Sequence, residues 1–364
     1  MILSERVTVL IPTFNRVKLL RRAIASVTRQ SYSEISIIVC DNASTDETEL
    51  VVRGLANCDN RIIYLRHPSN IGGLENFRHA FGMVQTPYFC VLSDDDFLTR
   101  DSIFDGVKVL TENANVGFVI QNSLWINERR ELISTGGHPI NNEVKLYCDQ
   151  TRFDAFHNLQ VPYIWTGMLF RGELSRLYLS KTMNNDIGSD FRYLFRVISK
   201  YNYAYLAKIG AFYTSHSGSM SSGRPYFDMV EHIKECERYI EILEDESVDE
   251  LIKERVRIYF LKLANNHPYK LALKEALRHL VKNWCNSPEL PDHSILKFAN
   301  DFSRNGFLKT AYFFSTIYKS RGLRFLIKFL YGGYNNYRIR KSRHAMNLLQ
   351  QTIYKPYFDD VGAL

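Results

Sequence analysis

Three consecutive carboxylates, Asp94-Asp95-Asp96, closely follow an apolar segment at 88–92 that has the composition of a buried strand. Adjacent like charges repel, so a fold that holds them together needs a nearby cation or a shared proton. Carboxylate oxygens that leave coordination positions open suit Mg²⁺ or Mn²⁺, which can bridge to the phosphates of a substrate. Ligands of open α/β sheets gather at the carboxyl ends of strands, which favours a metal site over the alternative, a solvated acidic turn.

Polar residues also follow the first two predicted strands, at residues 12–16 and at Asp41. A carboxylate at the end of a strand can accept hydrogen bonds from a nucleoside base or ribose. The alternative for this segment is a helix-capping turn with Ser44 or Thr45 as the N-cap, which leaves Asp41 free for binding. The chain has neither a GxxxxGK[ST] nor a GxGxxG loop, so we expect a metal to hold the phosphates of a bound nucleotide.

Strands and helices alternate over the first hundred residues, a pattern typical of a parallel α/β sheet with right-handed crossovers. It predicts strands at 7–11, 35–40, 61–65 and 88–92, and helices at 19–30, 47–55 and 74–84. Further along, it predicts a strand at 117–121, a polar loop or hairpin at 127–142, and helices at 226–243 and 248–264. We therefore expect a domain at 1–225 that carries the strand ends, and a helical region at 226–364.

Composition narrows the class of protein. A chain of 364 residues is long enough for two domains, and its formal charge of +7 fits anionic substrates or an anionic membrane surface without indicating nucleic acid. The six cysteines include no CxxC pair, which favours a reducing cytosol. Because Glu5 and Arg6 lie where a signal peptide is apolar, and no stretch approaches the roughly 18 apolar residues of a membrane span, we expect a cytoplasmic protein.

Four sequence blocks, in this order, resemble glycosyltransferase family 2. They are VLIPTFNR at 9–16, IVCDNASTD at 38–46, NIGG at 70–73 and LSDDD at 92–96. The resemblance covers residues 5–220 and implies the GT-A fold, an α/β, Rossmann-like mixed sheet flanked by helices, here followed by a helical C-terminal region. It also implies transfer of a sugar, with inversion, from a nucleotide-diphospho-sugar to a hydroxyl group.

The same resemblance implies the site residues. A nucleotide-sugar pocket would contain Pro12, Thr13, Asn15, Arg16, Asp41, Asn70, Gly72, Asp94 and Trp165. Asp94 would approach the ribose, while Asp95 and Asp96 would hold Mg²⁺ or Mn²⁺ on the diphosphate. The family often has Asp-x-Asp-Asp here, and Ser93 replaces the first Asp, which leaves open which carboxylate is the sole direct ligand. Trp165 would stack on a sugar, and the alternative for it is a place in the core.

Residues 184–194 resemble the family segment that carries the catalytic base. Asp190 fits that position, with Asp186 as the reserve, and Ser189 replaces the acidic residue that commonly precedes the base. In this role Asp190 would take the proton of an acceptor hydroxyl as its oxygen attacks the anomeric carbon. The other interpretation is that Ser189 or Asp190 only caps the helix that follows.

Residues 214–221 resemble a histidine-containing block of the family. His216 in this block would complete the metal site or bind the departing diphosphate, and the alternative is a structural histidine. The expected function is then synthesis of a bacterial surface polysaccharide, such as O-antigen, capsule or wall polymer, on a glycan or lipid-linked acceptor. Other candidates are a nucleotidyltransferase and a non-catalytic nucleotide-sugar-binding protein.

The segment at 307–345 interleaves basic and aromatic residues. Helical spacing puts Phe325 and Phe329 on one face, with Arg324 and Lys328 beside it. This pattern favours a helix that lies on an anionic membrane, as expected for a peripheral protein with a lipid-linked acceptor. The alternative is packing on the catalytic domain or on a second subunit of a homo-oligomer.

Overall fold

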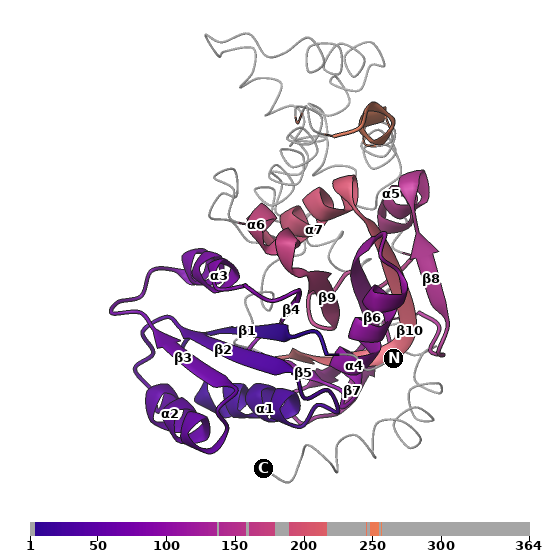
Figure 1. Ribbon diagram of the computed structural model, residues 1–364. Coiled ribbons are helices and arrows are strands. Elements are labelled where there is room, and N and C mark those ends of the chain that lie inside the picture. Colours follow the sequence, from indigo (N-terminus) through magenta and orange to yellow (C-terminus); the bar gives the residue numbers. More distant parts are fainter. Residues whose placement is uncertain are drawn as a thin grey trace, which may run out of the picture. The chain divides into compact units, whose positions relative to one another are not determined.

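The computed structural model describes residues 4–136, 138–157, 160–178, 189–216, 245, 248–254 and 256. Those up to 216 belong to one compact unit and those from 245 onward to another, and the following description concerns the first unit (Figure 1). The domain boundary near residue 225 and the helix at 226–243 lie outside the described residues and stay predictions. Of the helix predicted at 248–264, only its beginning is described, with residues 250–254 helical.

A mixed sheet forms the centre of this unit, in the order β3-β2-β1-β4-β9-β6-β10-β5, with β7 beside β6 and β8 beside β10. Its strands are β1 Val7–Thr13, β2 Ile35–Asp41, β3 Ile62–Arg66, β4 Tyr88–Val91, β5 Phe97–Leu98, β6 Val116–Asn127, β7 Leu132–Ser134, β8 Val144–Tyr147, β9 Met168–Arg171 and β10 Asn202–Ser215. The helices are α1 Val17–Thr28, α2 Thr48–Cys58, α3 Gly73–Gly82, α4 Ser102–Glu112, α5 Asp149–His157, α6 Ser175–Tyr178 and α7 Ser189–Lys200, with a short 3₁₀ turn at Gly172–Leu174.

The first four strands are parallel, as predicted, so their carboxyl ends meet at one edge of the sheet. Strand β1 runs two residues beyond its predicted end, through Pro12 to Thr13. Proline lacks an N–H group, and the backbone nitrogen of Pro12 points toward β4 rather than β2. The pairing of β1 with β4 has already ended at Leu10, opposite Val91. The missing donor therefore interrupts no ladder, and Thr13 reaches the edge where the site lies.

The second half of the sheet contains strands that the sequence pattern did not predict. Strand β10 pairs in parallel with β6 and antiparallel with β5 and β8. The strand predicted at 117–121 is only the first half of β6, and β7 within 127–142 pairs antiparallel with β6, so the hairpin is confirmed. The pairing of β10 with β5 and β6 brings the end of β10 to the same edge as the end of β4.

Helices cover both faces of the sheet: α1 and α2 lie on one face of β1–β3 and α3 on the other (Figure 1). The apolar spacing predicted for α1 is confirmed, because Leu20, Ile24 and Val27 are at most 1% exposed and join the main core cluster. Full burial of such a side chain stabilises the fold by about 1.5–3 kcal/mol. In the part of the chain that is described, we find no helix that is long and apolar enough to cross a membrane.

Candidate active site

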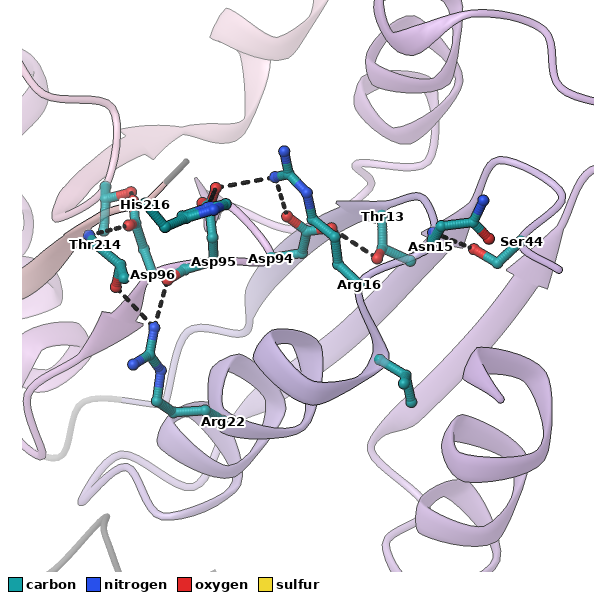
Figure 2. A network of polar contacts seen from close by, with 12 residues as sticks. Thr13, Asn15, Arg16, Arg22, Ser44, Asp94, Asp95, Asp96, Thr214 and His216 are labelled. Carbon is teal, nitrogen blue, oxygen red and sulfur yellow. Dashed lines mark hydrogen bonds and ion pairs between the residues drawn. The ribbon is translucent and has the colours of Figure 1, made fainter. Parts of the chain in front are cut away.

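The acidic turn, defined here as Asp94-Asp95-Asp96, lies between the ends of two strands that are distant in sequence (Figure 2). On one side are the last residue of β1, Thr13, and Arg16 in the turn that follows it, and on the other is the end of β10. The structure therefore brings together residues from blocks that the sequence separates by up to about 200 positions. Each of the three carboxylates has different partners.

Asp94 is bound to the end of β1 and to the turn that follows it. Thr13 Oγ1 donates to Asp94 Oδ2 at 2.7 Å, and Arg16 Nη1 donates to Asp94 Oδ1 at 3.0 Å. Burial, followed by the adjacent charge of Asp95, raises the pKa of Asp94 to about 6, against the opposing effect of Arg16 and Thr13. Burial alone would lower the pKa of Arg16, but the two carboxylates raise it overall, so the guanidinium stays charged.

Asp95 lies between two nitrogen groups. Its Oδ2 accepts a hydrogen bond from Arg16 Nη1 at 2.9 Å and lies 3.0 Å from His216 Nε2. The side chains of Asp95 and His216 are 12% and 8% exposed, so the contact is largely shielded from water. The predicted proximity of His216 to the acidic residues is thus present in the structure.

Asp96 points into the protein. It is 1% exposed, its Oδ1 accepts from the main-chain N–H of Thr214 at 2.8 Å, and its Oδ2 accepts from Thr166 Oγ1 at 2.5 Å. Burial, and then the charge of Asp95, raises its pKa well above the usual range for a carboxyl group. Its oxygens thus join the acidic turn to β10 and to the segment before β9.

The chemistry of these donors fits a divalent cation that also binds a substrate. Within the described residues, no three or more His, Cys, Asp or Glu side chains surround a common ion position. Mg²⁺, however, is usually held by one or two carboxylates together with phosphate oxygens, rather than by a complete protein cage. Two carboxylate oxygens, from Asp94 and Asp95, already converge on one cationic nitrogen of Arg16, so positive charge is favoured at this position. Carboxylate oxygens are ligands suited to Mg²⁺ and Mn²⁺.

Asp41, at the end of β2, is fully buried. Its Oδ1 accepts from the main-chain N–H of Ser44 at 2.8 Å, and its Oδ2 accepts from Tyr64 Oη at 2.5 Å. The guanidinium of Arg66 lies 3.5 Å from the same oxygen. Burial, followed by the hydrogen bond to Asp41, raises the pKa of Tyr64. The predicted nucleoside residue is therefore held rigidly by its own neighbours.

The alternative interpretation of the loop after β2, a helix cap at Ser44 or Thr45, is wrong. The helix begins at Thr48, whose N–H donates to Asp46 Oδ1 at 3.0 Å, and neither Ser44 nor Thr45 caps it. Instead, Ser44 Oγ accepts from the main-chain N–H of Asn15 at 2.9 Å, and Asn15 Oδ1 accepts from that of Thr45 at 2.7 Å. The loops after β1 and β2 are therefore bound to each other. A helix-capping rule considers only neighbouring residues, so it cannot predict these contacts.

The NIGG block joins the same edge through Asn42, a residue the sequence reasoning did not single out. Asn42 Nδ2 donates to Asn70 Oδ1 at 2.9 Å, and Asn42 Oδ1 accepts from the N–H of Ile71 at 2.9 Å. Gly72 has a φ of 89°, a conformation that favours glycine, and its N–H donates to Asn70 Oδ1 at 2.9 Å. The loop before α3 is thus fixed beside the end of β2.

Of two further predicted site residues, one lies in the core and the side chain of the other is not described. Trp165 is 7% exposed, with its ring centroid 5.7 Å from that of Phe81 and 5.3 Å from that of Tyr193, which is a core environment. Asp190 is the second residue of α7, but its side chain lies outside the described part of the structure, as does the whole of Asp186.

Sequence reasoning also missed residues that act through contacts across the sheet. Thr166 and Thr214 bind Asp96, and Arg22 of α1 binds the main chain of Asp95. A short motif contains no signal for such residues, since their partners are set by the packing of distant segments. Only Thr214 lies in a block with a recognisable pattern, residues 214–221.

Comparison with known proteins finds similarity to glycosyltransferases. The family model described as glycosyl transferase family 2 matches residues 8–172. The GalNAc(5)-diNAcBac-PP-undecaprenol beta-1,3-glucosyltransferase of Campylobacter jejuni is 33% identical over 114 residues, 31% of this chain and 36% of that protein. The abequosyltransferase RfbV of Salmonella typhimurium is 29% identical over 194 residues, 52% of this chain and 51% of that protein. The chain thus matches about half or less of the length of these relatives.

Among solved structures, the crystal structure of S. aureus TarS 1–349 in complex with UDP superposes with a TM-score of 0.56. The match covers 86% of this chain and 91% of that one, at 15% sequence identity. At this identity the similarity shows the fold alone, and that fold is the GT-A arrangement of a mixed sheet flanked by helices.

Proposed function

We propose that the protein is a metal-dependent, inverting glycosyltransferase, on the basis of the match of residues 8–172 to the glycosyl transferase family 2 model. It transfers a sugar from a nucleotide-diphospho-sugar to a hydroxyl group of a glycan or lipid-linked acceptor. The observation that carries this proposal is the convergence of Arg16, Asp94, Asp95 and His216 at the carboxyl edge of the sheet. Such an edge is where open α/β folds bind ligands.

The names of the relatives support a role in bacterial surface polysaccharide synthesis. One is named for glucosyl transfer to an undecaprenol-linked glycan and another for abequosyl transfer, while the TarS structure contains UDP. A nucleoside diphosphate is the product that remains when a sugar leaves such a donor. We therefore assign the described edge to the nucleotide part of the donor.

The nucleotide binds across the loops that follow β1, β2 and β4. Asp41 and the loop containing Asn70 and Gly72 form the nucleoside end, while Thr13 and Asn15 fix the loop beside it. Asp94 faces the ribose, where its link to Thr13 and Arg16 keeps the carboxylate in place. Pro12 lies where the pairing of β1 with β4 has already ended, at this edge, and Trp165 packs in the core.

The diphosphate lies at the other end of the edge. Asp95 and His216, 3.0 Å apart, are the residues that would hold Mg²⁺ or Mn²⁺, and a bound ion would neutralise charge on the leaving diphosphate. Asp96, the second metal ligand that the resemblance implies, also holds the turn against β10, because both of its oxygens accept hydrogen bonds from the protein. Arg16 adds a permanent positive charge beside the phosphates.

Asp190 serves as the general base at the start of α7. It takes the proton from the acceptor hydroxyl while that oxygen attacks the anomeric carbon from the side opposite the leaving group. A single displacement inverts the configuration of the sugar, and no second nucleophile takes part. The protein works in the cytoplasm, where nucleotide sugars are available, with its acceptor at the inner membrane surface.

The test is incubation with a panel of nucleotide sugars and Mn²⁺ or Mg²⁺, with measurement of nucleoside diphosphate release and of the anomeric configuration of the product by NMR. Release of nucleoside diphosphate with inversion is expected for one donor. In a parallel incubation with nucleoside triphosphates and sugar 1-phosphates, release of pyrophosphate would instead identify a nucleotidyltransferase. Binding of a donor without turnover, in the presence of glycan and lipid-linked acceptors, would favour a non-catalytic binding protein.

A further inference from the structure

Arg22 of α1 joins the two segments that carry the proposed metal ligands (Figure 2). Its Nη2 donates to the main-chain oxygen of Asp95 at 2.6 Å and to Thr214 Oγ1 at 2.7 Å. One guanidinium nitrogen therefore bridges the acidic turn and the end of β10, two residues before His216. Hydrogen bonds from a charged donor are stronger than those between neutral groups.

The guanidinium of Arg22 is also held by an aromatic stack. It lies 4.7 Å from the ring centroid of Phe97, and that ring stacks on Phe212 at 4.6 Å with an interplanar angle of 16°. Phe97 belongs to β5, directly after the acidic turn, and Phe212 belongs to β10. The stack thus joins the same two segments as the hydrogen bonds, and a planar guanidinium satisfies both contacts at once.

We infer that Arg22 is a positioning residue that sets the spacing between Asp95 and His216, and thereby the affinity of the site for a divalent cation with a nucleoside diphosphate. The inference rests on the proposed function. Arg22 binds the main chain of Asp95 and leaves its carboxylate free for other partners. On the β10 side it binds Thr214, whose main chain Asp96 also holds. Without Arg22, the segments that carry Asp95 and His216 lose the hydrogen bonds that hold them at this spacing.

The test measures Mn²⁺ affinity in Arg22→Met, which keeps an unbranched apolar side chain over Phe97 and removes the two hydrogen bonds. Mn²⁺ is titrated by calorimetry, and by the EPR signal of free Mn²⁺, in the presence of UDP, GDP, CDP or dTDP, whichever the wild type binds. We expect the Kd for Mn²⁺ to rise about 10- to 100-fold, as when partners that orient metal ligands are removed. Nucleotide affinity measured without metal should change far less, which separates this role from a general loss of structure.

Arg21→Met is the matched control, because Arg21 is an exposed arginine on the same helix. Its Kd for Mn²⁺ should stay within about twofold of the wild type, as for most surface substitutions. Arg22→Lys should recover part of the affinity, since one ammonium group can reach one or both oxygens but cannot reproduce the planar stack. Thermal melting of each variant establishes that it is folded.

A double-mutant cycle with Thr214→Val tests whether the bridge itself matters. If it does, Thr214→Val weakens Mn²⁺ binding in the wild type but has little further effect in Arg22→Met, because the contact is already absent. Thr214→Val also repeats the test if Arg22→Met does not fold. Unchanged Mn²⁺ affinity in a folded Arg22→Met, or strictly additive effects, overturns the inference alone. Failure of the wild type to bind any of the four nucleotides with Mn²⁺ contradicts the proposed function, and the inference with it.

Discussion

At the scale of single residues, the adjacent carboxylates of the acidic turn are chemically distinct because each has different neighbours. Asp95 contacts Arg16 and His216 at the edge of the sheet, whereas Asp96 is buried against Thr166 and Thr214. The same substitution should therefore affect function at one position and stability at the next. This contrast gives the first two predictions.

Asp95→Asn should remove most metal-dependent activity and leave the fold intact, since the loss of one of several clustered charges relieves repulsion. The measurement is the initial rate as a function of Mn²⁺ concentration, together with thermal melting. Glu112→Gln, an exposed acid at the end of α4, is the control and should behave as the wild type. Full turnover of the wild type in excess EDTA would contradict the assignment of a metal.

Asp96→Ala should destabilise the protein by about 1–3 kcal/mol, because it leaves the buried N–H of Thr214 without an acceptor. Asp96→Asn is the informative companion. Its amide oxygen can accept from Thr214, and its NH₂ group can donate to Thr166 Oγ1, so most of the stability should remain. Urea denaturation measures both. Equal stability of Asp96→Ala and the wild type would show that these hydrogen bonds contribute nothing.

Asp190→Asn should retain binding of the nucleotide sugar and lose transfer by about 10²- to 10⁴-fold, the usual contribution of a general base. Binding is measured by calorimetry with the intact donor, and transfer by product formation. Asp186→Asn is the matched comparison from the same segment. Normal turnover in Asp190→Asn, combined with its loss in Asp186→Asn, would move the role of base to Asp186.

At the scale of secondary structure, the close approach of β9 to the segment before β4 depends on a glycine. The N–H of Gly172 donates to Pro87 O at 2.7 Å, and a Cβ atom at this position would lie 2.1 Å from the main-chain oxygen of Thr86. Main chain cannot move away as a flexible side chain can. The pairing of β4 with β9, which supports the acidic turn, therefore requires the absence of a side chain here.

Gly172→Ala should lower the free energy of unfolding by about 1–3 kcal/mol, as expected for overpacking. Gly54→Ala in α2 is the opposite case, because a Cβ there meets no atom within 4 Å. It should raise stability by about 0.5–1 kcal/mol, since alanine is favoured over glycine inside a helix. Denaturant unfolding of both variants checks the pair, and destabilisation by Gly54→Ala would contradict the argument.

At the scale of the whole molecule, the basic and aromatic segment at 307–345 lies outside the described residues, and its membrane role stays a prediction. Each basic residue near an anionic leaflet contributes about 1 kcal/mol, so replacing Arg321, Arg324 and Lys328 by Gln in the full chain should weaken binding to anionic vesicles. Co-sedimentation with phosphatidylserine vesicles at low and high salt measures it. Equal, negligible binding by both proteins, with a dimeric wild type, would favour a packing role.

The sequence alone determined the features that depend on local chemistry. The alternation of strands and helices, the apolar face of α1 and the acidic turn after β4 all follow from residue periodicity and side-chain type. The family resemblance added the order of the blocks, which the match to residues 8–172 confirms. These features are local because backbone geometry and the burial of one face are specified by neighbouring residues.

Only the tertiary structure decided which distant groups meet. Strand β10 was not predicted, because its place depends on pairing with β5, β6 and β8, and local propensity does not specify such partners. For the same reason, the sequence does not predict the hydrogen bond from Tyr64 to Asp41. Nor does it predict the hydrogen bond from Arg22 to Thr214, a residue 192 positions away. Contacts of this kind are set by the register of the sheet and the packing of helices on it, so they exist only once the whole sheet has formed.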